Sequence, residues 1–410
     1  MPWRMCALPA FTRIFRRPTI LTASSANCAR LKPPPISERR SLSAGLHAAD
    51  ARFMALALDL GARGLGQVWP NPAVGCVIVQ EGRIVGRGRT APGGRPHAEP
   101  QALAQAGARA RGATAYVSLE PCAHHGATPP CAEALVAAGV ARVVSALEDP
   151  DTRVAGRGHA LLRAAGIEVQ TGVLAARAAR DHAGFLMNRR AGRPWVTLKL
   201  ATSLDGRIAT GSGESRWITG PGARRAVHAL RARHDAVLVG GGTARADDPG
   251  LDVRGLGVAH QPVRVVCARR LDLPEGGRLA QGAAGPLWLC HGADAPPAAQ
   301  ARWAARGARL FEVAVGPDRQ LDPQAVLAAL GQAGLTRVLC EGGGSLAAAL
   351  LAAGLVDEVV AHTAGLALGA EGRPALGALG VGALAEAPRL ELEETAAIGG
   401  DVMHRWLVRR

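Results

Sequence analysis

The 410-residue sequence has few aromatic residues and no long apolar run. No stretch of 18 apolar residues is free of charge, which argues against a membrane-spanning helix and predicts no membrane partner. Only five Phe, seven Trp and one Tyr occur in the whole chain. Proteins that bind single-stranded nucleic acids stack bases on aromatic side chains, so this composition argues against a nucleic-acid substrate.

Cysteine is also scarce, and its spacing excludes some kinds of site. The eight cysteines are scattered along the chain, and no Cys-x-x-Cys pair occurs. Closed structural zinc sites usually contain such pairs, so their absence argues against one. Dispersed cysteines without a disulfide framework predict a reducing compartment, and we expect a cytoplasmic protein.

The net charge of +15 is concentrated near the N-terminus. Residues 1–47 contain eight Lys and Arg residues and a single acid, Glu38. This segment resembles a transit peptide; the alternative, which we favour, is a translation start assigned too far upstream. In either case we expect a disordered basic extension outside the fold. The remaining basic surface suits phosphate-bearing small molecules as well as it suits nucleic acid.

Three residues have the spacing of a catalytic zinc site. His97 is followed by Cys122 and, after an eight-residue gap, by Cys131. One imidazole and two thiolates fill three positions of a tetrahedral zinc ion and leave the fourth for water, whose pKa zinc lowers toward about 7. Glu99, two residues after His97, is placed to carry a proton from that water to departing ammonia, as in zinc-dependent base deaminases.

The order of predicted elements indicates two α/β domains, residues 48–192 and 193–410. In the first half we expect helices at residues 52–63, 98–110, 132–138 and 158–165, strands at 74–79, 84–88, 116–119 and 142–146, and a helical connection at 173–192. In the second half we expect strands at residues 195–200, 235–239, 263–267, 286–289, 337–340 and 358–362, and a helix at 346–353.

Two of the later strands run directly into glycine clusters, residues 240–242 and 342–344. Glycines let backbone amides approach a phosphate, and a helix N-terminus adds a favourable dipole, so a dinucleotide is a natural ligand here. Neither cluster has the G-x-G-x-x-G pattern, which argues against an ordinary Rossmann domain. Simple turns are the alternative explanation.

Lysine is nearly absent, since the chain has 46 Arg and only two Lys, and Lys199 is the only lysine after residue 47. An ammonium group is a compact donor whose pKa can move, unlike that of a guanidinium. We interpret Lys199 as a catalytic residue that faces a substrate; an incidental edge lysine is the alternative.

Several longer motifs resemble those of the bifunctional riboflavin-biosynthesis deaminase-reductases. The resemblance covers residues 51 to about 408. It is carried by Asn71-Pro72-x-Val74-Gly75, His97-Ala98-Glu99, the segments 120–131 and 154–158, Leu198-Lys199-x-x-x-Ser203-Leu204-Asp205-Gly206, the segments 213–219 and 246–249, and Glu341-Gly342-Gly343. The two matching halves stand in the order found in that family.

The resemblance implies a cytidine-deaminase-like three-layer α/β/α domain followed by a dihydrofolate-reductase-like α/β domain. The first would deaminate 2,5-diamino-6-ribosylamino-4(3H)-pyrimidinone 5′-phosphate with one zinc ion per chain. The second would use NADPH to reduce the ribosyl product to the ribityl compound. The implied partners are therefore phosphorylated pyrimidines, and we expect a homo-oligomer.

The resemblance also implies the contacts of each ligand. The pyrimidine substrate would meet Asn71 and His124 beside Glu99 in the deaminase site, and Ser215, Arg231, Leu251, Arg254 and Glu341 in the reductase site. NADPH would meet Ala201, Trp217, Thr243, Asp247, Gly343, Gly344, Ser345, Leu346, Ala347, Ala348 and Ala349. Arg231 and Arg254 suit a bidentate grip on phosphate. Lys199 or a water near Glu341 would supply the proton for reduction.

Three positions depart from the family pattern. Thr90 stands where a histidine is common, Ala127 where a lysine or arginine usually helps to hold phosphate, and Cys267-Ala268 where a strand end commonly carries Asp-Ser or Asp-Thr. Arg89 and Arg95 are the candidates to replace the phosphate contacts.

Two other classes of protein remain as alternatives. A tRNA or nucleoside deaminase with an unrelated second domain would carry Cys-x-x-Cys and stacking aromatics. A non-catalytic regulator would have lost Glu99 or a zinc ligand, whereas this chain keeps them all.

Overall fold

The computed structural model describes residues 38–126, 129–151, 154–281 and 285–409. One compact unit, Leu46–Arg410, contains the sheets described below. Among the described residues, no helix combines the length and the apolar character needed to cross a membrane.

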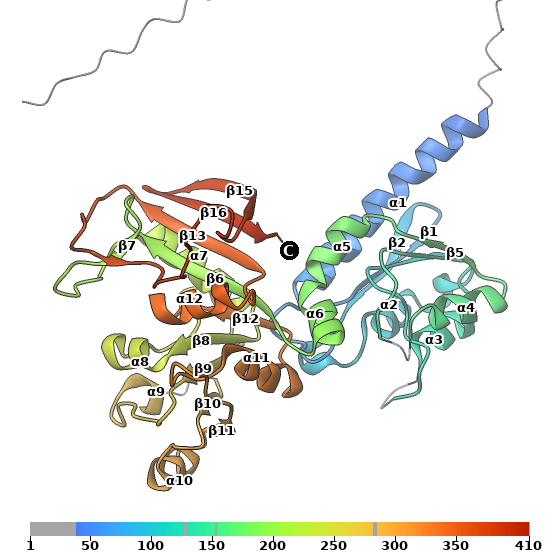
Figure 1. Ribbon diagram of the computed structural model, residues 1–410. Coiled ribbons are helices and arrows are strands. Elements are labelled where there is room, and N and C mark those ends of the chain that lie inside the picture. Colours follow the sequence, from blue (N-terminus) through green and yellow to red (C-terminus); the bar gives the residue numbers. More distant parts are fainter. Residues whose placement is uncertain (1–37, 127–128, 152–153, 282–284, 410) are drawn as a thin grey trace, which may run out of the picture. The chain divides into compact units, whose positions relative to one another are not determined.

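The first domain is a five-stranded sheet between helices (Figure 1). Its strand order is β2-β1-β3-β4-β5, where β1 pairs antiparallel with β2 and β3, and β3, β4 and β5 run parallel. The elements are α1 (Glu38–Ala62), β1 (Gly75–Gln80), β2 (Arg83–Arg89), α2 (Ala98–Ala106), β3 (Thr114–Val117), α3 (Cys131–Ala137), β4 (Arg142–Ser145), α4 (Arg157–Ala164), β5 (Glu168–Thr171), α5 (Ala175–Asp181) and α6 (Ala183–Ala191).

The side chains of β1 point alternately to the two faces of the sheet, and this explains the three layers of the domain. Cys76 and Ile78 belong to one apolar core with α2, α3 and α4, whereas Val77 and Val79 belong to a second core with α1 and α5. Successive strand residues point to opposite faces, so a strand buried on both faces reads as a continuous apolar run. The sheet is therefore covered by helices on both sides.

The second domain is a nine-stranded sheet in the order β11-β10-β9-β8-β12-β6-β13-β16-β15. All pairings from β11 to β13 are parallel, and β16 and β15 add antiparallel pairings at one edge. Its strands are β6 (Trp195–Thr202), β8 (Ala236–Gly240), β9 (Val263–Cys267), β10 (Leu287–His291), β11 (Arg309–Glu312), β12 (Arg337–Cys340), β13 (Glu358–Ala364), β15 (Leu390–Ile398) and β16 (Asp401–Val408). Two short strands, β7 (Arg207–Ala209) and β14 (Arg373–Pro374), form a separate antiparallel sheet.

Helices cover both faces of the parallel part of this sheet. They are α7 (Pro221–Ala232), α8 (Gly241–Asp247), α9 (Arg278–Gln281), α10 (Pro297–Ala305), α11 (Pro323–Gln332) and α12 (Gly344–Ala352). One apolar core joins β8, β9 and β10 to α11 and α12, and another joins the opposite face of the same strands to α8, α9 and α10.

Most elements lie where the sequence predicts them, but several strands were not predicted. β5, β7, β11, β14, β15 and β16 are absent from the predicted set. β15 is exposed along most of its length, so it lacks the buried apolar run that marks the interior strands. The predicted helix 98–110 is also too long, because Gly107 leaves helical geometry and a 3₁₀ turn, Gly107–Ala110, follows. The basic segment 1–47 lies outside the described residues up to residue 37, and α1 begins at Glu38.

A buried ion pair joins the beginning of the second domain to its sheet. Both nitrogens of the Arg193 fork donate to Asp357 (2.8 and 2.9 Å), which also accepts the Val196 N–H (2.8 Å). Both side chains are buried. We expect Asp357→Ala to lower the free energy of unfolding of this domain by about 3–5 kcal/mol, because it leaves a guanidinium buried without its partner.

Urea unfolding monitored by circular dichroism measures this effect. Asp318→Ala is the matched control, because Asp318 is exposed. Equal stability of the Asp357→Ala variant and wild type would show that the pair does not hold the domain together.

Candidate active sites

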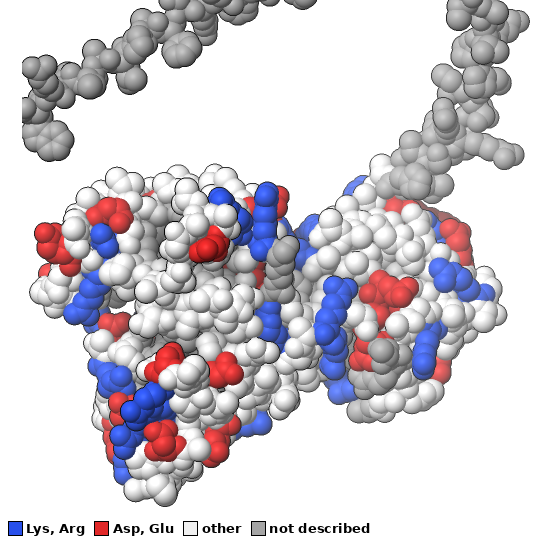
Figure 2. All heavy atoms as spheres, viewed as in Figure 1, with Lys and Arg blue, Asp and Glu red and all other residues white. Residues whose placement is uncertain are grey.

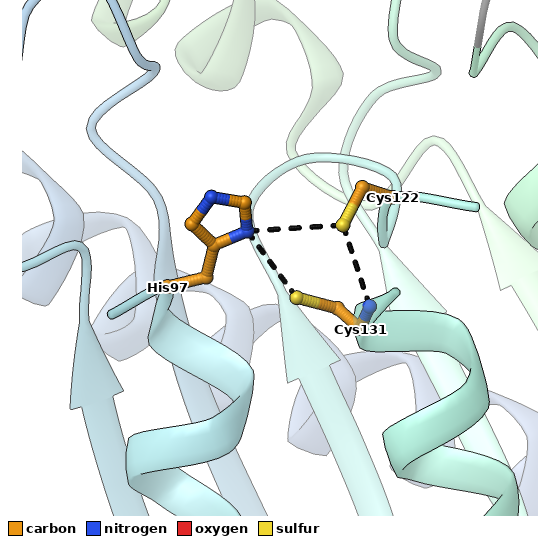
Figure 3. Close-up of side chains that lie close together, drawn as sticks. All are labelled: His97, Cys122 and Cys131. Atoms are coloured by element: carbon orange, nitrogen blue, oxygen red, sulfur yellow. Dashed lines mark hydrogen bonds between the residues drawn. The ribbon is translucent and has the colours of Figure 1, made fainter. Parts of the chain in front are cut away.

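His97, Cys122 and Cys131 meet in the first domain (Figure 3). Their candidate ligand atoms all lie within 4.8 Å of one another. The Nδ1 atom of His97 lies 3.3 Å from the Cys131 sulfur and 3.7 Å from the Cys122 sulfur. The backbone N–H of Cys131 donates to the Cys122 sulfur (3.3 Å). The predicted ligand set is therefore brought together.

The positions of these residues follow from the ends of helices and strands. His97 has extended backbone geometry at the N-cap of α2, and Cys131 is the first residue of α3. Cys122 follows β3 after a short segment, and the N–H of Ala132 donates to its carbonyl oxygen (3.1 Å). Two helix N-termini thus face the site, and their dipoles favour the negative charge of thiolates.

The protonation of the two cysteine sulfurs suits a metal ion. Hydrogen bonding with Cys131 and His97 lowers the pKa of Cys122 to about 4. The neighbouring Cys122 thiolate and burial raise the pKa of Cys131, so the two sulfurs share a proton that a cation displaces. A set of two sulfurs and one imidazole nitrogen fits tetrahedral zinc with one position left open.

Glu99 lies in the first turn of α2 beside the cysteine and histidine ligands and is buried. Burial, reinforced by the Cys122 thiolate and opposed by His97, raises its pKa to about 7. A carboxyl group with a pKa near neutrality can both accept and release a proton at neutral pH. This is the property expected of the predicted proton carrier.

A cavity of about 150 Å³ opens onto these residues. Its wall includes the predicted substrate contacts Asn71 and His124 together with Glu99. Thr90 also lines it, but its hydroxyl accepts the Val74 N–H (3.0 Å) and donates to the Pro72 carbonyl (2.9 Å). Thr90 therefore holds the loop that carries Asn71.

The other candidates for phosphate contacts differ in position. Arg95 lines the cavity, whereas Arg89 donates to the Arg63 carbonyl oxygen (2.9 Å) and does not line it. Ala127 lies outside the described residues.

Three further cavity residues, Asp149, Phe185 and Arg189, were not predicted. Asp149 follows the carboxyl end of β4, and burial raises its pKa to about 6. Its place in the loop that begins at the carboxyl end of a strand was a usable signal, because functional side chains collect in such loops. Phe185 and Arg189 come from α6, beyond the last strand of the sheet, and no local pattern marks them.

In the second domain, Lys199, Arg231 and Glu341 form a charged cluster. Arg231 forms a bidentate ion pair with Glu341 and also donates to the Asp252 carbonyl oxygen (2.8 Å). Burial works against ionisation of Glu341, but Arg231 and Lys199 outweigh it and lower its pKa. Burial also lowers the pKa of Lys199, although Glu341 opposes the shift. The cluster thus places an ammonium group that can release its proton beside a carboxylate.

The glycine clusters lie at the carboxyl ends of adjacent parallel strands, β8 and β12. Gly342 approaches β8 so closely that an added Cβ would lie 2.5 Å from the Val239 Cα, and Gly343 has a φ of +61°. A Cβ on Gly343 would meet the Thr243 hydroxyl at 3.0 Å. Thr243 and the start of α12, two predicted NADPH contacts, are therefore neighbours.

The remaining predicted reductase residues are distributed around these strands. Ala201 lies on β6, and Leu251 is buried. Asp247 is the last residue of α8, and its backbone carbonyl oxygen accepts a hydrogen bond from the Arg216 guanidinium (2.7 Å). Trp217 is 68% exposed with the Arg224 guanidinium over its ring. Arg254 contacts Asp252 (3.1 Å). Ser215 is half-buried in the loop that follows β7. Cys267, the departure at the end of β9, lies beside Cys290 in the pairing of β9 with β10.

Comparison with known proteins agrees with both sites. Residues 47–147 match the cytidine and deoxycytidylate deaminase zinc-binding region, and residues 194–404 match the RibD C-terminal domain. The riboflavin biosynthesis protein RibD of Escherichia coli K12 is 42% identical over 367 residues, which cover 86% of this chain and 98% of the relative. The chain belongs to the RibD family.

Solved structures of the RibD family have the same fold. Acinetobacter baumannii RibD superposes with a TM-score of 0.80 at 40% identity and covers 89% of this chain and 100% of its own. The Thermotoga maritima diaminohydroxyphosphoribosylaminopyrimidine deaminase/5-amino-6-(5-phosphoribosylamino)uracil reductase gives a TM-score of 0.78 at 31% identity, covering 88% of this chain and 99% of its own. The predicted fold class is confirmed.

Membership of the RibD family confirms the predicted class of activity. The chain is a bifunctional enzyme of riboflavin biosynthesis, with a zinc-dependent deaminase domain and an NADPH-dependent reductase domain. The individual substrate and cofactor contacts remain predictions.

Proposed function

We propose that the enzyme deaminates 2,5-diamino-6-ribosylamino-4(3H)-pyrimidinone 5′-phosphate and then reduces the ribosyl side chain of the product to ribityl. The observation that carries this proposal is the cluster of His97, Cys122 and Cys131 beside the buried Glu99, in a chain that also has a RibD reductase domain. A deaminase alone would not need the second domain.

In the proposed deamination, His97, Cys122 and Cys131 hold zinc, which when bound supplies an acidified water. Asn71 and His124 orient the pyrimidine in the cavity. Glu99 takes a proton from the attacking water and passes it to the amino group, which leaves as ammonia. The shifted pKa of Glu99, about 7, allows it to do both.

In the proposed reduction, NADPH supplies the hydride, and its contacts are those predicted around Thr243, Asp247 and the segment 343–349. Lys199 donates the proton to the sugar oxygen, because it is a half-buried ammonium group whose pKa burial lowers. Arg231 forms an ion pair with Glu341 and so orients that carboxylate. Of the two predicted phosphate contacts, Arg254 has the more exposed side chain and is better placed to bind phosphate.

The proposal includes the domain limits 48–192 and 193–410, a cytoplasmic location, a homo-oligomeric state and a substrate that is not a nucleic acid. Acidic and basic side chains are interspersed on the face shown in Figure 2. Such mixing supports recognition of small phosphorylated ligands at individual sites, since nucleic acid is usually bound by an extended basic surface.

Zinc removal separates the two activities and tests this proposal. After dialysis against a chelator, we expect ammonia release to stop while reduction of separately supplied deaminated intermediate continues at the untreated rate. The reason is that the zinc ligands lie in the first domain, whereas Lys199 and Glu341 lie in the second. Ammonia release should return when zinc is restored. Continued deamination without zinc would contradict the proposal.

A further inference from the structure

The side chain of Glu120 joins residues 120–122, called here the zinc-ligand segment because it ends at Cys122, to the loop and helix that follow β4. Glu120 is buried, two residues before Cys122. One carboxylate oxygen accepts the backbone N–H groups of Gly158 (2.9 Å) and His159 (3.2 Å). The other accepts those of Asp149 (3.1 Å) and Gly156 (3.0 Å). Each carboxylate oxygen therefore accepts two hydrogen bonds from backbone N–H groups, which fills its acceptor capacity.

Of the four residues whose N–H groups Glu120 binds, Asp149 lines the deaminase cavity, and the other three follow the cavity residue Val154 in the chain. Asp149 and Val154 line that cavity together with Glu120 and Cys122. Gly158 and His159 are in the first turn of α4, so the carboxylate also caps this helix. Gly158 packs on the zinc-ligand segment so closely that an added Cβ would lie 2.0 Å from the Pro121 carbonyl oxygen. The wall of Asp149 and Val154 is thus held to the zinc-ligand segment at several points.

We infer that Glu120 is a positioning residue for deamination, which fixes the substrate-binding wall of Asp149 and Val154 relative to the zinc ligand Cys122. The inference rests on the proposed deamination of a phosphorylated pyrimidine. Glu120 itself transfers no proton, because both of its oxygens are occupied by backbone donors. Its effect is on the binding of the pyrimidine.

A second metal site is the competing explanation for this cluster. Ligand atoms of Glu120, Glu148 and His159 lie within 4.8 Å of one another. However, the four backbone N–H groups already bind both oxygens of Glu120, and the Nδ1 atom of His159 lies 3.8 Å from one of them. A cation would have to displace these partners, so the hydrogen-bonded arrangement is the better account.

Glu120→Gln tests the inference, because it replaces one acceptor oxygen by an NH2 group that faces backbone donors. We expect the KM of deamination to rise at least about tenfold, as for about 1.4 kcal/mol of lost binding. The kcat of deamination should change much less. Zinc should stay at one per chain, and reduction of supplied intermediate should be unchanged. Glu148→Gln is the matched control, since Glu148 is exposed in the same cluster and should leave every constant unchanged.

Hydrogen exchange supplies a readout besides activity. The amides of Asp149, Gly156, Gly158 and His159 should exchange faster in Glu120→Gln than in wild type. An unchanged KM, a loss of zinc together with a fall in kcat, or a second bound zinc in wild type would each overturn the inference.

A second variant keeps the test decisive if Glu120→Gln does not fold. Gly158→Ala keeps the carboxylate but forces the wall away from Pro121, so it should raise KM in the same way. A wild-type KM for Gly158→Ala would overturn the inference. If wild-type enzyme itself releases no ammonia from the pyrimidine phosphate, the proposed function fails instead.

Discussion

Glu99→Gln should reduce the rate of deamination by about 100- to 10,000-fold, the usual range for loss of a general acid-base residue. The amide has the shape of the carboxyl group but cannot accept a proton from water and pass it on. Zinc should remain bound, because Glu99 is not among the three clustered ligands. Ammonia release and metal content measured on the same preparation check both statements.

Two comparisons make this result specific to Glu99. Glu81→Gln, in the exposed turn between β1 and β2, is the matched control and should deaminate at the wild-type rate. Reduction of supplied intermediate by Glu99→Gln should also be normal. A Glu99→Gln enzyme that deaminates at the wild-type rate, or that has lost its zinc, would contradict the assigned role.

Lys199→Arg should reduce the single-turnover rate of reduction by a similar factor, about 100- to 10,000-fold. A guanidinium keeps the charge, but it is planar and does not release its proton, so it does not replace a compact ammonium donor. NADPH affinity, measured by fluorescence, should be unchanged, because the glycine clusters at 240–242 and 342–344 provide the proposed phosphate contacts. Normal reduction would assign Lys199 to packing, and lost NADPH affinity would make it a cofactor contact.

The pH dependence of reduction gives an independent test of Lys199. The proton donor is the ammonium form, and burial lowers the pKa at which this form is lost. The single-turnover rate of wild-type enzyme should therefore fall as pH rises, beginning below the usual titration range of lysine. Lys199→Arg should lack this decline, because its side chain does not titrate there. A wild-type rate that stays constant through pH 10 would contradict proton donation by Lys199.

The zinc site was predictable because its chemistry is carried by short motifs at helix ends. His97 and Glu99 are two residues apart, and Cys131 begins a helix, so local sequence fixes how each side chain is presented. The interior strands were predictable for a related reason, since strands buried on both faces read as apolar runs.

Features that depend on distant parts of the chain were not predictable in the same way. The ion pair between Arg231 and Glu341 joins residues 110 positions apart, so no local pattern predicts it. Arg189 enters the deaminase cavity from α6, after the last strand of its sheet. The exposed edge strand β15 was missed because pairing with its one neighbour, β16, and not its own apolar pattern, determines its conformation.

The most direct test of the bifunctional assignment is to count both reactions in one purified preparation. The enzyme is given the diaminopyrimidine phosphate and NADPH, and ammonia release and NADPH oxidation are followed together. The account predicts that ammonia appears first and that NADPH oxidation then reaches the same total, one molecule of each per molecule of substrate. NADPH oxidation without ammonia release, or complete deamination with no oxidation of NADPH, would contradict it.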